Sequence, residues 1–189
     1  MNQTDPLPGG VALLLLGIGV AGVTGLSLSQ GDVGFARSQW SALLALVLAA
    51  PAIALYVLEP GPPGPWWRSF WTVGAAAYLL HVWWVAFGTY NGNFHAILAR
   101  QGFVAITNVA VIILWSLDAA LAWFGPHWPN PKVRRALRFI AWAAVTLSFI
   151  TAAPLFPTGS VRTIAIGVGV LVILALLLRY FRLIDWKPA

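Results

Sequence analysis

Long apolar blocks separated by short polar segments make up nearly the whole chain. The hydrocarbon core of a bilayer is about 30 Å thick, so a helix needs roughly 20 apolar residues to cross it. Each block approaches this length. The pattern therefore predicts six membrane-spanning segments, near residues 11–28, 40–58, 70–87, 103–124, 137–156 and 163–178.

The continuous apolar character of these blocks predicts helices. Backbone N–H and C=O groups in lipid must be paired within their own segment, and a helix achieves this. Strands of a membrane barrel would show alternating hydrophobicity over about ten residues, and the blocks do not alternate. The spans and their connections use almost all of the sequence. We therefore expect residues 1–189 to form a single all-α domain, a transmembrane helical bundle without a separate soluble catalytic domain.

Composition supports lipid as the main contact of this chain. Hydrophobic residues account for 60 % and charged residues for 8 % of the sequence. The absence of cysteine excludes disulfides, thiolate metal sites and cysteine-based redox chemistry. A net charge of +6 would suggest a nucleic-acid partner in a soluble protein. Here the placement of the cations gives a simpler explanation, and we expect no nucleic-acid partner.

The cations favour one side of the membrane if the chain crosses it six times. That side receives basic residues of the second and fourth loops and of the tail, namely Arg68, Lys132, Arg134, Arg135, Arg138, Arg179, Arg182 and Lys187. The opposite side holds Arg37, Arg100 and Arg162. Because Lys and Arg are enriched in short cytoplasmic loops, we expect both termini on the cytoplasmic side. We expect the membrane to be the bacterial cytoplasmic (inner) membrane.

Small residues recur at four-residue spacing in the first and last blocks. Gly17, Ala21 and Gly25 follow this spacing in the first block, and Ala165 and Gly169 repeat it in the last. A stripe of small residues lets another helix approach closely in lipid. We expect helix packing within the chain at these positions. A dimer seam or a contact with another subunit is the alternative.

Tryptophan is abundant, with 11 residues in the chain. Trp66, Trp67 and Trp71 fall near a predicted span end, where aromatic side chains commonly sit at the membrane interface. Others lie deeper, namely Trp83, Trp84, Trp115 and Trp142. We expect these mainly to fill volume between helices, although they could line a pocket for a flat ligand. The segment 93–100 outside the blocks predicts a short interfacial helix.

Two ionisable residues lie well inside the predicted spans, His81 and Asp118. Such residues are costly in lipid and are therefore candidates for a functional site. Each belongs to a polar stripe that we expect to face the bundle interior. Together the stripes supply the candidate cofactor-binding residues His81, Tyr78, Trp84, Trp115, Asp118 and Asn108.

Counting along the predicted helices at about 1.5 Å per residue places His81 and Asp118 at depths that differ by about 8 Å. This offset is large for a direct hydrogen bond, and Tyr78 matches the depth of Asp118 better. We expect Asp118 to be protonated or to pair with a cation, with Arg138, Arg179 and His81 as candidates. If Asp118 has only a structural role, it fixes the register of neighbouring helices. His81 would then be a neutral ring bonded to a neighbouring carbonyl or hydroxyl.

No motif fixes a reaction. The HExxH, P-loop and GxSxG patterns are absent, no clustered metal ligands occur, and we predict neither a catalytic residue nor a metal site. A haem, quinone or pigment at His81 and Tyr78 is a minor alternative. For haem, His95 would be the second axial ligand, provided that its loop dips inwards.

Three functions remain. The sequence favours a non-catalytic accessory or scaffolding subunit of a larger membrane complex, with membrane-protein partners or further copies of itself. The alternatives are a cofactor-binding redox subunit that uses His81, and a small transporter in which Asp118 titrates. A transporter would be expected to have more polar residues lining its pathway and at least one helix broken near the membrane midplane.

Overall fold

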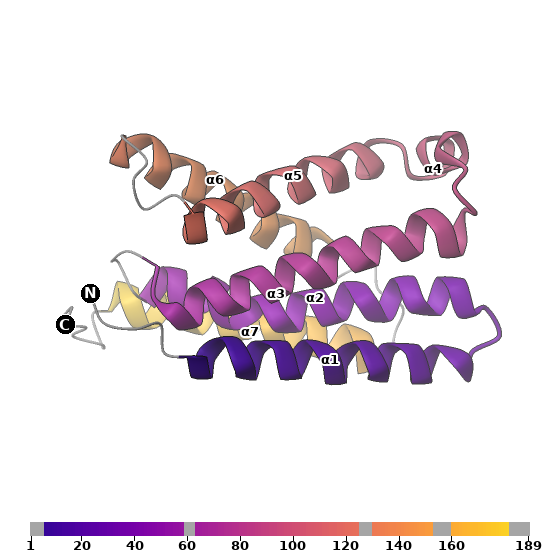
Figure 1. Ribbon diagram of the computed structural model, residues 1–189, viewed down its shortest axis with the longest axis horizontal. Helices are drawn as coiled ribbons and strands as arrows, with labels where there is room; N and C mark the ends of the chain where they lie inside the picture. Colours follow the sequence, from indigo (N-terminus) through magenta and orange to yellow (C-terminus); the bar gives the residue numbers. More distant parts are fainter. Residues whose placement is uncertain (1–5, 59–62, 125–129, 153–159, 182–189) are drawn as a thin grey trace.

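Every regular element in the described part of the chain is helical. The computed structural model describes residues 6–58, 63–124, 130–152 and 160–181. The elements are α1 (Pro6–Leu28), α2 (Val33–Leu58), α3 (Pro65–Trp83), the π-helix η1 (Trp84–Thr89), α4 (Phe94–Gln101), α5 (Phe103–Phe124), α6 (Pro131–Ala152) and α7 (Ser160–Tyr180) (Figure 1). The predicted all-α class is confirmed for these residues. Arg182 and Lys187 of the predicted basic tail lie outside them.

Five segments are long and apolar enough to cross a membrane: Leu7–Leu28, Val33–Leu58, Pro65–Thr89, Phe103–Phe124 and Arg162–Tyr180. They are compatible with the predicted bilayer environment. Within the described residues, α6 is not among them, because its first two turns carry four basic side chains, those of Lys132, Arg134, Arg135 and Arg138. The predicted fifth span extends to residue 156, and residues 153–159 lie outside the described part. A sixth crossing therefore stays a prediction.

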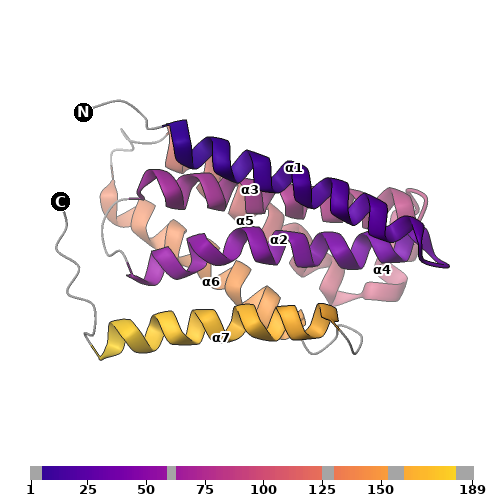
Figure 2. The same cartoon turned by 90° about the horizontal axis from the view of Figure 1, so that it is seen from below.

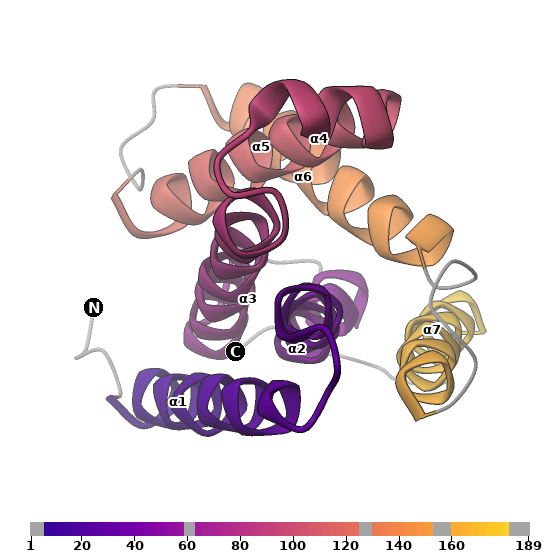
Figure 3. The same ribbon diagram turned by 90° about the vertical axis from the view of Figure 1, so that its right-hand side faces the viewer.

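Helix α2 occupies the centre of the bundle, with α1, α3 and α7 packed around it (Figure 3). Helix α5 packs on the far side of α3, and α6 packs on α5. The α2–α3 contact is close because small side chains meet there. A Cβ atom added to Gly74 would lie 2.9 Å from Trp115 and 3.1 Å from the Cβ of Ala49. Gly74 therefore permits the packing of α2, α3 and α5.

Helices α6 and α7 do not pack along each other. Helix α7 lies on α2, whereas α6 runs obliquely between α5 and α7 (Figures 2 and 3). The start of α1 and the end of α7 lie at the same end of the bundle, on the left of Figure 1. Which side of the membrane this end faces stays a prediction.

Among the helices that begin earlier than the apolar pattern predicts, α2, α3 and α6 have local features that set their first turn. The carboxylate of Asp32 accepts the N–H of Phe35 at 2.9 Å before α2. Pro65 occupies the first turn of α3, where a missing N–H costs nothing. The side chain of Asn130 accepts the N–H of Lys132 at 3.0 Å before α6. Hydrophobicity alone identifies only the apolar part of each helix.

The short helix predicted at 93–100 is present as α4. The side chain of Asn93 accepts the N–H of Ala96 at 3.0 Å, which caps its first turn. The preceding reversal uses left-handed backbone at Asn91 (φ 49°) and Gly92 (φ 75°). Phe94 and Leu98 are exposed on its surface, as an interfacial position would require.

The small-residue stripe of α1 faces outwards, which corrects the expected packing within the chain. Gly17, Ala21 and Gly25 are exposed, and a Cβ on either glycine would have no other group within 4 Å. Gly19, on another side of α1, instead makes the close approach to Leu44 of α2. A contact of the outward stripe with another subunit stays a prediction.

Candidate functional site

His81, near the end of α3, is bonded to the first turns of α2. Its Nδ1 lies 2.8 Å from the carbonyl oxygen of Ser38 and 3.3 Å from the hydroxyl of Ser41. Because a carbonyl can only accept a hydrogen bond, Nδ1 carries a hydrogen atom and donates a hydrogen bond to the carbonyl of Ser38. The ring thus ties α3 to α2. This is the contact that we expect if His81 has a structural role, with its imidazole bonded to a neighbouring carbonyl.

Tyr78, one turn before His81, bonds to α5. Its hydroxyl donates to the side-chain oxygen of Asn108 at 2.9 Å, and its ring lies 5.6 Å from the imidazole of His81. Tyr78 is buried, so the hydroxyl would be costly to leave without a partner. The predicted stripes of α3 and α5 therefore do face each other at this level.

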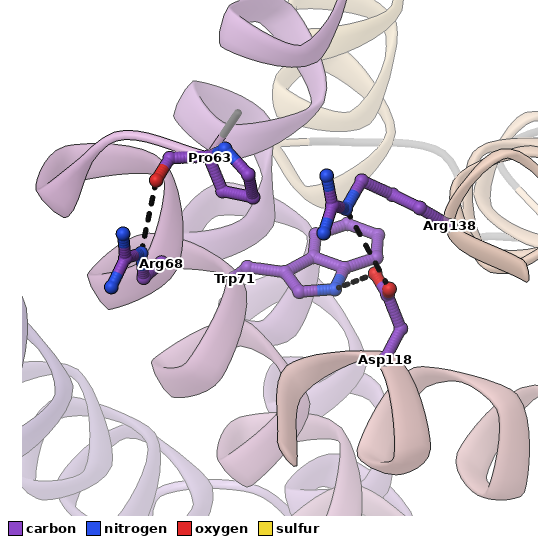
Figure 4. Close-up of polar contacts among 5 residues, drawn as sticks. All are labelled: Pro63, Arg68, Trp71, Asp118 and Arg138. Carbon is purple, nitrogen blue, oxygen red and sulfur yellow. Dashed lines mark hydrogen bonds and ion pairs between the residues drawn. The ribbon is translucent and has the colours of Figure 1, made fainter. Parts of the chain in front are cut away.

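Asp118 of α5 is 2 % exposed and lies between Trp71 and Arg138 (Figure 4). The indole N–H of Trp71 donates to Oδ2 at 3.0 Å. The Nε of Arg138 lies 3.8 Å from Oδ1, which is an ion pair without a direct hydrogen bond. Of the three cations considered from sequence, Arg138 is therefore the one beside Asp118. Arg179 instead bonds the carbonyl of Val57.

Trp71 is the site residue that sequence reasoning missed. It was expected at the interface, yet Trp71 is 0 % and Trp67 2 % exposed, whereas Trp66 remains exposed. Helix α3 begins at Pro65, so Trp71 lies six residues (71 − 65) from its start. Asp118 lies six residues (124 − 118) from the end of α5. The two side chains are therefore level, about 9 Å inside at the helical rise.

A continuous row of aromatic rings connects these contacts. Ring centroids lie 5.3 Å apart for Trp67 and Trp71, 5.0 Å for Trp71 and Trp115, and 5.6 Å for Trp115 and Tyr78. Trp115 is 1 % exposed, and its indole N–H donates to the carbonyl of Trp71 at 3.1 Å. The row fills the space between α3 and α5, as expected for Trp115.

The other deep tryptophans differ from one another. Trp83 is 58 % exposed and faces away from the bundle, which corrects its expected interior position. Trp84 begins η1 and is partly buried, and no hydrogen bond or ring stacking in the described part of the chain joins it to the other candidates. Trp142 donates to the carbonyl of Ile53 at 3.2 Å and lines both cavities described below.

The larger cavity, of about 670 Å³, lies among the ends of α2, α3, α6 and α7. Four arginines line it, and we call it the arginine cavity; they are Arg134, Arg135, Arg138 and Arg179. The guanidinium of Arg138 also lies 5.4 Å from the ring of Trp67. The sequence placed these cations on one side of the membrane. Only the fold brings Arg179 of α7 to the arginines of α6.

A second cavity, of about 510 Å³, lies between α2, α6 and α7 and shares Trp142 and Leu176 with the first. Apart from Thr146, its lining is apolar or glycine. The predicted packing residues of α7, Ala165 and Gly169, line this apolar cavity. Neither cavity is lined by His81, Tyr78, Trp84, Trp115, Asp118 or Asn108.

Among the residues that the structure describes, no three His, Asp or Glu side chains come together as metal ligands. Comparison of the chain with protein-family models, with curated proteins and with solved structures gave no match.

Proposed function

We propose that this protein is a non-catalytic accessory or scaffolding subunit of a larger complex in the bacterial inner membrane. The observation that supports it best is the outward stripe of α1. Gly17, Ala21 and Gly25 leave a shallow, small-residue face on a helix long and apolar enough to span a membrane. Such faces favour close helix association in lipid.

The interior polar contacts support the same proposal. His81, Tyr78 and Asp118 each bond a group on a neighbouring helix. Each contact occupies polar atoms that would otherwise be available to bind a substrate or cofactor. Their role in this proposal is to fix the rotation and register of α2, α3 and α5.

Extraction in a mild detergent tests the proposal through a matched pair of variants. Gly17→Leu fills the outward stripe, whereas Gly22→Leu places the same side chain on a different side of α1, where a Cβ also has no other group within 4 Å. We expect a partner chain to co-purify in fixed ratio with the unchanged protein and with Gly22→Leu. Gly17→Leu should release it while remaining folded.

Three outcomes would overturn the proposal. The first is equal retention of the partner by both variants, or a folded protein that never holds a partner. The second is a visible absorption band or a bound quinone that disappears in His81→Ala, which would favour the redox subunit. The third is proton or solute flux in liposomes that Asp118→Asn abolishes, which would favour the transporter.

A further inference from the structure

The arginine cavity carries a large excess of positive charge. Arg134, Arg135, Arg138 and Arg179 line it, and none of the described residues that line it is acidic. The carboxylate of Asp118 lies outside the lining and 3.8 Å from Arg138, so it offsets one cation. Guanidinium groups bind phosphate through paired N–H donors and remain charged under all ordinary conditions. The cavity is therefore complementary to a phosphate-bearing anion.

The apolar cavity continues from this charged site. Trp142 and Leu176 line both cavities, so the two meet at these side chains. From there the apolar cavity runs between α6 and α7 with α2 as its floor. The small side chains of Ala165 and Gly169 leave room on α7, and a Cβ on Gly169 would have no other group within 4 Å. A soluble anion would leave this space unfilled.

Thr146 is the polar side chain among the residues that line the apolar cavity. Its Oγ1 is buried, and no hydrogen-bond partner exists for it in the described part of the chain. A buried hydroxyl without a partner is costly. An ester oxygen of an acyl chain would supply the missing acceptor.

We propose that the cleft between α6 and α7 binds one anionic phospholipid. Its phosphate lies among the four arginines, and an acyl chain follows the apolar cavity past Trp142 towards Gly169. The predicted topology places the arginines at the cytoplasmic headgroup level, where anionic lipids attract basic residues. This site requires no partner subunit, so it stands or falls separately from the scaffolding role.

A fluorescence titration tests the proposal with the full chain in detergent. The probes are phosphatidylglycerol with a brominated acyl chain, phosphatidylcholine with the same chain, and inorganic phosphate. Bromine quenches nearby indoles, so a chain in the apolar cavity quenches Trp142. We expect saturable quenching by phosphatidylglycerol, much weaker quenching by phosphatidylcholine, and no competition from inorganic phosphate at equal concentration.

Variants separate the headgroup site from the chain site. Arg135→Gln should weaken phosphatidylglycerol binding about fivefold, whereas Arg100→Gln, in α4 at the other end of the bundle, should leave it unchanged. Gly169→Leu should abolish the saturable part of the quenching by filling the apolar cavity. Gly17→Leu, with the same change on the exposed stripe of α1, should preserve quenching. The unquenched tryptophan emission and the elution volume establish that each variant is folded.

Several results would overturn the proposal. Binding of inorganic phosphate as tight as that of the lipid would indicate a site for a soluble anion. Equal losses in Arg135→Gln and Arg100→Gln would indicate general attraction to charge. Saturable quenching that survives Gly169→Leu would place the acyl chain elsewhere. Should Gly169→Leu not fold, Ala165→Leu provides the same test, because Ala165 also lines the cavity.

Discussion

The contact between α3 and α5 and the cleft between α6 and α7 use polar side chains in opposite ways. In the first region Trp71 donates to Asp118 and Tyr78 donates to Asn108, so buried polar groups face each other. In the second, four arginines line an open cavity and Thr146 keeps a buried hydroxyl without a described partner. Hydrogen bonds between buried polar groups hold helices together, whereas the guanidinium groups at the cavity also face a space that a ligand can enter.

Arg138 belongs to both regions. One side of its guanidinium approaches Asp118 and the ring of Trp67, and the residue also lines the arginine cavity. Figure 4 shows it reaching from α6 towards the Trp71–Asp118 hydrogen bond. A change at Asp118 should therefore affect helix packing first and the charge of the cavity second.

The largest stability difference should come from glycine at the close helix contact. Gly74→Val would force a side chain against Trp115 and Ala49 and should cost about 1–3 kcal/mol. Gly17→Val is the matched control on the open face of α1, and its effect should be near zero. The midpoint of unfolding in sodium dodecyl sulfate, followed by tryptophan fluorescence, measures both. Equal midpoints would contradict the close α2–α3 packing.

Asp118→Leu should have the next largest effect. It removes the acceptor of Trp71 and the counter-charge of Arg138, so we expect a loss of about 1–2 kcal/mol in the same unfolding assay. Asp118→Asn keeps an oxygen for the indole N–H and should lose less. A double-mutant cycle with Trp71→Phe measures the interaction free energy between Asp118 and Trp71. Strict additivity would show that the two residues do not interact.

Tyr78→Phe should have a smaller effect, because the hydrogen bond that it removes from Asn108 joins two neutral groups. Polar contacts between membrane helices average about 0.6 kcal/mol, and we expect a loss of this size. Asn108→Leu combined with Tyr78→Phe should cost less than the sum of the two single changes. If the losses of stability in the two single variants add up to the loss in the double variant, the hydroxyl of Tyr78 donates to a different acceptor.

Thr146→Val should not destabilise the lipid-free protein. The buried hydroxyl has no described partner, so replacing it with a methyl group should leave stability unchanged or raise it by up to about 1 kcal/mol. The same change should weaken phosphatidylglycerol binding if an ester oxygen meets this hydroxyl. A clear loss of stability without lipid would show that Thr146 is bonded within the protein. The cleft between α6 and α7 would then resemble the contact between α3 and α5 in this respect.

The all-helical class could be predicted from the sequence, because helix formation depends on local properties. Apolar length and periodicity identify the helical segments, and a residue such as the N-cap Asp32 or the first-turn Pro65 determines where a helix begins. The inward position of His81 and Asp118 also followed from the cost of exposing them to lipid. Their bonding partners did not follow, because a depth counted along one helix depends on where that helix begins.

The sequence by itself determined an all-helical, strongly apolar chain, with its interior ionisable residues at His81 and Asp118. These features depend on chain composition and on the rise of a helix. The tertiary structure decided that Trp71 bonds Asp118, that the stripe of Gly17 faces outwards, and that Arg179 joins Arg138 at one cavity. The physical reason is that the rotation of each helix and its choice of neighbours result from packing all the helices at once, which no local pattern records.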